Sequence, residues 1–216
     1  MAYTAWSVVF GEQPTAAKWN QLGTNDAGFK DGTNFDNDII KSKHLDWAAI
    51  GGGDSGGIWW EELGRHTLSS NANQMEVTAI PARKYLRFLI VAIGTGGAVS
   101  VDMQFNNDVS ATSYGYAVST QTGGADGSAT TSRVVFDTNV TTTAKVFCDA
   151  VNIANREKLI DGLCVDGETL GGANIPTRRL VYGKWANTAA QISSVKVSTT
   201  SNNYASGSEI VVLGHN

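Results

Sequence analysis

Charged side chains are scarce in this chain. Asp, Glu, Lys and Arg make up 17% of its 216 residues, against roughly a quarter in ordinary soluble domains. The formal net charge is -4, and the Lys and Arg residues are scattered along the chain. A phosphate backbone is bound mainly by clustered cations, so this composition argues against a nucleic-acid partner.

Long apolar runs are missing as well. The longest, residues 88–93, is far shorter than the roughly 20 residues that a helix needs to cross a bilayer. Residues 1–6 have neither the basic nor the apolar stretch of a signal peptide. We therefore expect no membrane insertion and no secretory export, so that any exit from a cell would follow lysis.

Cysteine and histidine, the usual ligands of transition metals, are few. The two cysteines, Cys148 and Cys164, and the three histidines, His44, His66 and His215, show no metal-ligand spacing. We accordingly expect no metal site and no other cofactor.

Gly, Thr, Ser and Asn dominate instead, around short apolar segments. From residue 58 onward, segments with strand character alternate with Gly, Asn and Asp turn signals, and no amphipathic helix of ordinary length is visible. The expected strands are 58–63, 74–80, 84–93, 99–105, 112–119, 132–136, 143–153, 158–166, 178–186, 191–199 and 207–213. This pattern predicts a mainly β fold, an antiparallel β-sandwich of jelly-roll type.

Side-chain periodicity assigns faces to some of these strands. Met75, Val77 and Ala79 share one face of their strand, because successive side chains alternate. The run 84–93 is mostly apolar, which predicts a central strand covered on both faces. In 99–105 the odd-numbered residues are apolar and are expected to face inward.

The two cysteines provide a test of strand pairing. Segments 143–153 and 158–166 flank Asn155-Arg156, a turn signal, and a hairpin about that turn brings Cys148 opposite residue 163 or 164. We predict that Cys148 and Cys164 are cross-strand neighbours that remain free thiols, because the cytoplasm where the chain assembles is reducing.

The first 57 residues differ from the rest. Thr15 is a plausible N-cap of a short helix over 16–22, which is too short to be stable alone. Residues 51–57 are a Gly-rich linker. We therefore predict an N-terminal attachment segment over 1–50, a linker over 51–57, and a β-sandwich domain over 58–216.

Two parts of the chain resemble bacteriophage virion proteins. Residues 10–23, with Pro14, Trp19-Asn20 and Leu22, look like the opening of many phage tail-fibre and related particle proteins. In those proteins a short helix and an Asp/Asn-rich segment precede an attached β-domain.

The second resemblance lies in the β-region. Phe105-Asn106-Asn107-Asp108 followed by Tyr114, together with residues 204–214 near the end, are similar to a recurrent phage β-sandwich with an "FNxD…Y" motif and a Gly-bounded last strand. The resemblance implies a virion component of the tail-fibre, adaptor or capsid-decoration type, and it carries over no catalytic residues. In physical terms Asn, Asp and Gly at these positions favour turn and packing roles.

Three patterns with catalytic or metal-binding character have simpler explanations. Ser55, within Gly53-Asp54-Ser55-Gly56-Gly57, resembles a serine-protease nucleophile loop, but only His44 precedes it and a Gly-rich linker explains the same letters. Glu61 and Glu62 are adjacent in an expected strand and so point to opposite faces. A calcium site formed by Asp102, Asp108 and Asp126 is less expected than solvated turn aspartates.

Aromatic side chains are the candidates for a binding surface. They stack on sugar faces, and they are also the commonest residues of subunit interfaces. The candidate residues for a glycan or subunit interface are Trp59, Trp60, Tyr114, Tyr116, Trp185 and Tyr204.

We therefore expect a non-enzymatic structural component of a bacteriophage particle, located in the virion and contributing to host attachment. Its expected partners are further copies of itself, with a homotrimer preferred, other virion proteins bound through residues 1–50, and a host surface glycan. The alternatives are a carbohydrate-binding module that recognises a cell-surface glycan and a glycan hydrolase, for which the sequence shows no facing carboxylates.

Overall fold

The computed structural model describes residues 16, 17, 20, 60–120, 126–167, 171–173 and 175–216. The chain divides into two compact units, Met1–Gly57 and Ile58–Asn216. Ala16, Ala17 and Asn20 have helical backbone, and the rest of the predicted attachment segment and the 51–57 linker lie outside the described residues. Among the described residues, no helix has the length and apolar character needed to cross a membrane.

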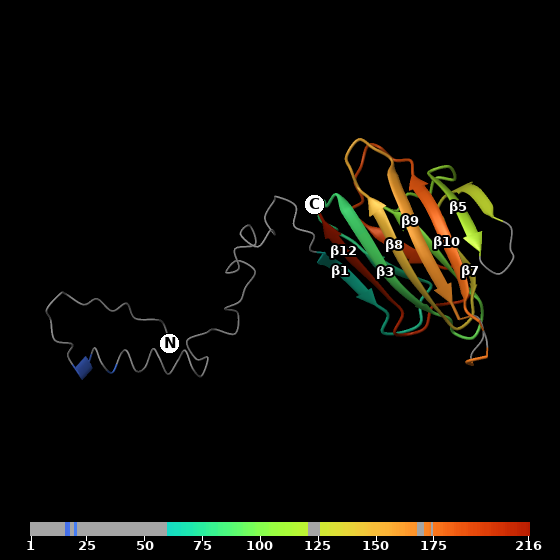
Figure 1. Ribbon diagram of the computed structural model, residues 1–216, viewed down its shortest axis with the longest axis horizontal. Coiled ribbons are helices and arrows are strands. Elements are labelled where there is room, and N and C mark those ends of the chain that lie inside the picture. Colours follow the sequence, from blue (N-terminus) through green and yellow to red (C-terminus); the bar gives the residue numbers. More distant parts are fainter. Residues whose placement is uncertain (1–15, 18–19, 21–59, 121–125, 168–170, 174) are drawn as a thin grey trace. The chain divides into compact units, whose positions relative to one another are not determined.

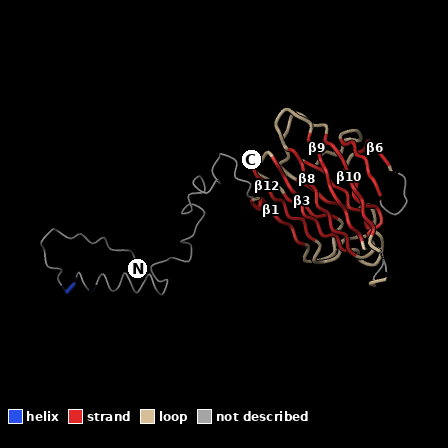
Figure 2. The backbone as a smooth tube through the Cα atoms, viewed as in Figure 1, coloured by secondary structure: helices blue, strands red, loops and turns tan. Residues whose placement is uncertain are grey.

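The second unit is built of antiparallel strands in two sheets (Figure 1). The strands are β1 (Glu61–Thr67), β2 (Gln74–Val77), β3 (Tyr85–Ile93), β4 (Val99–Phe105), β5 (Tyr114–Thr120), β6 (Gly127–Thr131), β7 (Val134–Val140), β8 (Thr143–Val151), β9 (Lys158–Asp166), β10 (Thr177–Trp185), β11 (Val195–Ser198) and β12 (Glu209–His215). One sheet has the order β1-β12-β3-β8-β9-β10-β5-β6 and the other the order β2-β11-β4-β7. Figure 2 shows that, apart from the loops, strands make up almost all of the described part.

The core lies between these sheets and follows from side-chain alternation. On β3, Leu86, Phe88, Ile90 and Ala92 are buried, while the residues between them are half-buried or exposed. Met75 and Val77 of β2 belong to the same buried cluster as the inward residues of β3. One continuous apolar core therefore joins the inner faces of the two sheets.

An ion pair also joins the sheets. The Arg179 guanidinium of β10 contacts the Asp137 carboxylate of β7, and the side chain of Asp137 is fully buried. Opposite charges at this depth are tolerated because they are paired, so this contact specifies how β10 and β7 approach each other.

Most of the expected strands are present, with three differences. Gly127, placed in a turn by the sequence, begins β6, a strand that the prediction missed. Ala79 lies beyond the end of β2, is exposed and has a φ of 55°, so its predicted inward position was wrong. The third concerns β3, which was expected to be covered on both faces: within the described residues only its even-numbered side chains are buried.

The predicted hairpin of the two cysteine strands is confirmed. β8 pairs antiparallel with β9, Cys148 lies opposite Gly162, and Cys164 lies opposite Val146. The thiols are therefore diagonal neighbours on the core face rather than directly opposed. Both are free and buried. Burial raises the pKa of the Cys164 thiol to about 12 and that of Cys148 well above its usual range, so neither is a reactive thiolate.

Candidate functional site

The outer face of the eight-stranded sheet is the surface on which the site is built. Its central strands β3, β8, β9 and β10 turn every second side chain away from the core. In an antiparallel sheet with one solvated face these positions are ordinarily polar. Here several are large and apolar, with exposed fractions of 57% for Tyr182, 41% for Phe147 and 38% for Val91.

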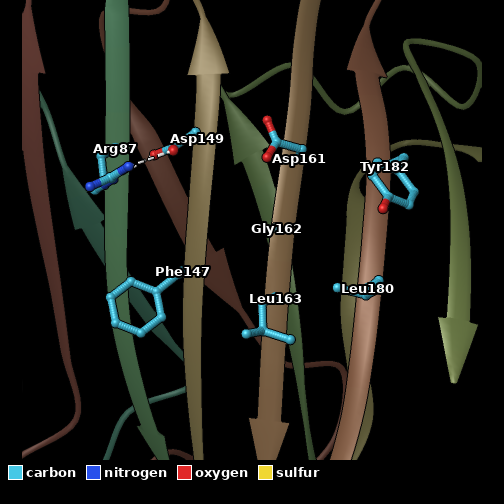
Figure 3. A pocket seen from close by; sticks show the side chains of 8 residues that line it. All are labelled: Arg87, Phe147, Asp149, Asp161, Gly162, Leu163, Leu180 and Tyr182. Carbon is cyan, nitrogen blue, oxygen red and sulfur yellow. Dashed lines mark hydrogen bonds and ion pairs between the residues drawn. The ribbon is translucent and has the colours of Figure 1, made fainter. Parts of the chain in front are cut away.

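Strand register aligns five of these outward residues into a line, called here the apolar row. It runs across β12, β3, β8, β9 and β10 and consists of Val211, Leu89, Phe147, Leu163 and Leu180, each opposite the next. Figure 3 shows its last three members side by side on neighbouring strands. Val211 is itself buried, so the apolar line reaches the surface on the other four strands, where it is a single feature and differs from scattered exposed residues, which need no explanation.

A second line, the polar row, lies two residues away on the same strands. Its members are Leu213, Arg87, Asp149, Asp161 and Tyr182, again opposite one another in order. Arg87 donates two hydrogen bonds of 2.7 Å to the two carboxylate oxygens of Asp149 (Figure 3). These bonds raise the pKa of Arg87, which therefore remains a cation.

Asp161 is the unbalanced charge of the polar row. It stands directly opposite Asp149, whose charge Arg87 already neutralises. The Asp161 carboxylate accepts no hydrogen bond from the described residues, and it is exposed. Like charges directly opposite destabilise a sheet, so this arrangement costs the fold free energy and calls for a cationic or hydrogen-bonding partner.

A third line, the cationic row, lies on the other side of the apolar row. Its members are Glu209, Val91, Lys145, Val165 and Arg178. The Lys145 ammonium lies 4.3 Å from the ring centroid of Phe147, and neither Lys145 nor Arg178 forms an ion pair within the described residues. Glu209 already forms an ion pair with Arg65. The face thus carries unpaired carboxylate on one side of the apolar row and unpaired cations on the other.

A shallow hollow of about 360 Å³ lies over the polar and apolar rows. It is lined by Arg87, Phe147, Asp149, Asp161, Gly162, Leu163, Leu180 and Tyr182. Gly162 is required at its floor, because a Cβ there would lie 2.6 Å from Cε1 of Phe136 and 2.9 Å from the carbonyl oxygen of Phe147.

One of the predicted interface residues, Trp60, bears on this face. Trp60 is half-buried, and its ring lies 4.5 Å from the Arg87 guanidinium carbon, next to His215 at 4.7 Å. Tyr116 is half-buried and packs on the core cluster instead of standing on the outer face. Trp59 lies outside the described residues.

The other three predicted interface residues were placed wrongly. Tyr114, Trp185 and Tyr204 are completely buried and cannot touch a glycan or a second subunit. Their polar atoms are used internally: the Tyr204 hydroxyl donates to the Ser100 carbonyl at 2.6 Å and the Trp185 indole N–H donates to Asp108 at 2.8 Å. Tyr114 bonds to the backbone of Phe105.

The "FNxD" motif has the turn role that its residue types indicated. Asn106 and Asn107 have φ values of 51° and 54°, and the Asn106 amide holds the loop before β11 by bonding to Gln191, Ser193 and Ser194. Asp108 caps the same turn at the Ser110 amide. The motif therefore joins two loops at one end of the core.

The remaining candidate residues are Ser55, His44, Glu61, Glu62 and the aspartates of the possible calcium site. Ser55 and His44 lie outside the described residues. Glu61 and Glu62 bind different arginines, Arg83 and Arg65. No group of three His, Cys, Asp or Glu side chains that could hold a metal is found in the part of the chain that the structure describes.

Asp102 is a buried carboxylate on β4, only 2% exposed. Its Oδ2 accepts a hydrogen bond of 2.9 Å from Ser100 and lies 3.4 Å from Arg133, whereas Oδ1 has no hydrogen-bond partner. Desolvation raises the pKa of Asp102 above its ordinary value of 3.8. Because the folded state holds this proton more tightly than the unfolded state, Asp102 supports folding at low pH and opposes it as the pH rises past that range.

We therefore expect Asp102→Asn to raise the free energy of unfolding at pH 7 by about 1 kcal/mol, because the substitution removes a buried charge whose desolvation outweighs its contacts with Ser100 and Arg133. The gain should shrink near pH 3, where the wild-type carboxyl is also neutral. Urea unfolding of both proteins at the two pH values measures this. A difference that does not change with pH would contradict the assignment.

Sequence reasoning missed the residues that make this face: Arg87, Phe147, Asp149, Asp161, Leu163, Leu180 and Tyr182. The available signal was apolar residues at the outward positions of four strands, for example Phe147 between Lys145 and Asp149. Periodicity marks those positions strand by strand, but it does not say which of them come into line.

Comparison with known proteins adds no relative. No protein-family model matches the chain, and the comparisons with curated proteins and with solved structures found no match.

Proposed function

We propose that this chain is a non-enzymatic structural component of a bacteriophage particle, and that its β-domain assembles with further copies of itself. The tail-fibre, adaptor or decoration role and the docking of residues 1–50 on other virion proteins belong to the same proposal. They rest on the sequence resemblance, whereas the case for self-assembly rests on the outer face.

We infer further that the fold is a β-sandwich of jelly-roll type. If β5, β6, β9 and β10 are left out, the strand orders of the two sheets are β1-β12-β3-β8 and β2-β11-β4-β7. This is the order in which an eight-stranded jelly roll pairs its strands, and the four additional strands extend one sheet. Viral capsid proteins and lectins both use this architecture, so the fold is compatible with assembly and with sugar binding.

The observation that carries the proposal is the apolar row. Three of its members, Leu89, Leu163 and Leu180, are half-buried, and Phe147 is exposed, so the row is only partly covered by the chain itself. Association with a matching surface would remove this apolar area from water, which is the main driving force of subunit contacts.

The extent of the face sets the expected strength of association. With strands about 4.8 Å apart and rows about 6.8 Å apart, five strands by three rows cover about 500 Å² on each partner. That is near the lower end of specific interfaces, which bury at least about 1,000 Å² in total. We therefore expect an association that depends on protein concentration.

The test is the mass of the full chain by light scattering over a concentration series. Wild type is expected to rise above the monomer mass, and Leu163→Asp is expected to remain a monomer, because a carboxylate in the apolar row would lose its hydration on association. The matched control is Ile175→Asp, which changes an 88% exposed apolar residue outside the strands and should behave like wild type.

The outcome separates the alternatives. A wild-type chain that is monomeric throughout, or equal effects of the two substitutions, would contradict assembly through this face. The mass of the wild-type complex also decides between the trimer expected from the sequence and other numbers of chains.

One observation favours the second candidate, a carbohydrate-binding module. The hollow places exposed Tyr182 beside Asp161, with Trp60 near Arg87, and aromatic rings beside hydrogen-bonding groups suit a saccharide. If the wild-type chain is a monomer and binds glycans on an array, with binding lost in Tyr182→Ala, this second function replaces the first.

A further inference from the structure

We infer that two copies of this domain pair face to face about a two-fold axis that runs along the apolar row. This inference rests on the proposed self-assembly and specifies its partner, its orientation and its symmetry. It predicts an even number of chains in place of the trimer expected from the sequence.

The argument begins with the order of the rows. The polar row carries the unpaired Asp161, the apolar row lies in the middle, and the cationic row carries Lys145 and Arg178. A rotation of 180° about the apolar row leaves each strand facing its own copy in the opposite direction. It therefore lays the polar row of one copy over the cationic row of the other.

The register then specifies which residues meet. Asp149 comes opposite Lys145 of the second copy, and Tyr182 comes opposite Arg178 of the second copy. Asp161 comes opposite Val165, between these two cations. Each contact occurs twice, and the row of Leu89, Phe147, Leu163 and Leu180 meets its own copy along the axis.

These contacts give partners to the charged side chains that form no ion pair within the described part of the single chain. Asp161 gains two flanking cations, Lys145 and Arg178 gain carboxylates, and the Tyr182 ring gains a guanidinium with which it can form a cation–π contact. Asp161 and Tyr182 are both exposed, so a second copy can reach them, and Figure 3 shows their side chains on the neighbouring strands β9 and β10.

The other simple two-fold arrangement is disfavoured by the same charges. An axis parallel to the strands, between β8 and β9, would lay Asp149 over Asp161 of the second copy and gather the cations of both copies on the other side. Like charges brought together at an interface cost several kcal/mol, so the charge pattern selects the axis along the row.

The experiment uses charge reversal in the full chain. Variant one is Asp161→Lys, and variant two is Lys145→Glu with Arg178→Glu. All three residues are exposed, so both variants should fold, and Asp161→Lys, which removes the like-charge pair with Asp149, should not lower the melting temperature. Each variant alone is expected to have a dissociation constant at least tenfold above that of wild type, because its two symmetric contacts become repulsive.

Mixing the two variants provides the decisive measurement. In the mixed pair the cation introduced by Asp161→Lys in one chain faces the two carboxylates introduced in the other, and the one like-charge contact that remains is between Asp149 of the first chain and the carboxylate introduced at position 145 of the other. The unchanged Asp161 of that other chain faces Lys145 and Arg178 of the first. The equimolar mixture is therefore expected to form a heterodimer at concentrations where each variant is monomeric, as followed by sedimentation or by a mass-tagged chain.

Each result has a distinct meaning. If Leu163→Asp dissociates the wild-type complex but the mixture fails to pair, self-assembly stands and the two-fold orientation is wrong. A wild-type complex of three chains would also overturn the two-fold pair while leaving assembly in place. If wild type never associates, both proposals fall together.

Discussion

Replacing Trp185 with alanine is expected to lower the free energy of unfolding by about 4 kcal/mol, the middle of the range for a buried aromatic. Trp185 is fully buried, its ring centroid lies 5.8 Å from that of Phe105, and its indole N–H bonds to Asp108. The substitution removes the largest side chain of the core and a hydrogen bond together. The free energy of unfolding of a single domain is about 5–15 kcal/mol in total, so a loss of this size should be easy to measure by urea unfolding.

The control for this prediction lies on the same strand. Tyr182 is three residues away on β10 but points outward, with 57% of its surface exposed, so Tyr182→Ala should cost less than about 1 kcal/mol. Both are measured at a concentration where wild type is monomeric. If Trp185→Ala does not fold, Trp185→Phe keeps the aromatic ring and should lose only about 1–2 kcal/mol. Equal effects of the alanine variants would show that Trp185 is not a core residue.

Asn106→Ala is the second large effect, with an expected loss of about 4 kcal/mol in the free energy of unfolding. Its side-chain oxygen accepts from the amides of Ser193 and Ser194, and its amide nitrogen donates to the carbonyl of Gln191. Alanine leaves these groups of the loop before β11 without partners, and each such loss costs about 1 kcal/mol. Alanine is also strained at a φ of 51°. Thermal or urea unfolding measures the sum.

Asn107→Ala separates the two causes. Asn107 has almost the same backbone conformation, with a φ of 54°, but its side chain makes only two hydrogen bonds of 3.3 Å at the surface. Its substitution should therefore cost the backbone strain alone, about 1 kcal/mol. If Asn106→Ala costs no more than Asn107→Ala, the loop is not held by the Asn106 amide.

The strands and turns could be predicted from the sequence, because side-chain alternation and turn residues are signals within short segments. The hairpin of β8 and β9 followed from Asn155-Arg156, with Asn155 in the left-handed region at a φ of 59°. The register differed slightly, since Cys148 faces Gly162 rather than residue 163 or 164. β6 was missed because its sequence, Gly127 to Thr131, has no large apolar residue to mark a face.

The residues of the site were harder to predict from the sequence, because their positions on a face depend on more than residue type. Aromatic residues were chosen by type, and type alone does not separate a core ring from a surface ring. Trp185 and Tyr182 lie on one strand three residues apart, so they differ in parity and face opposite sides. The alternation of β10 distinguishes them once the direction of one residue is known.

By itself, the sequence determined that the chain is mainly β, that its strands end at Asn, Asp and Gly turns, and which residues of each strand share a face. These properties depend on neighbours in the chain, through backbone sterics and the two-residue period. Only the tertiary structure decided that β12, β3, β8, β9 and β10 lie side by side, with Phe147, Leu163 and Leu180 in one line. Long-range pairing of strands, and the charges that it brings together or leaves unpaired, depend on how the whole core closes, and no short segment encodes that.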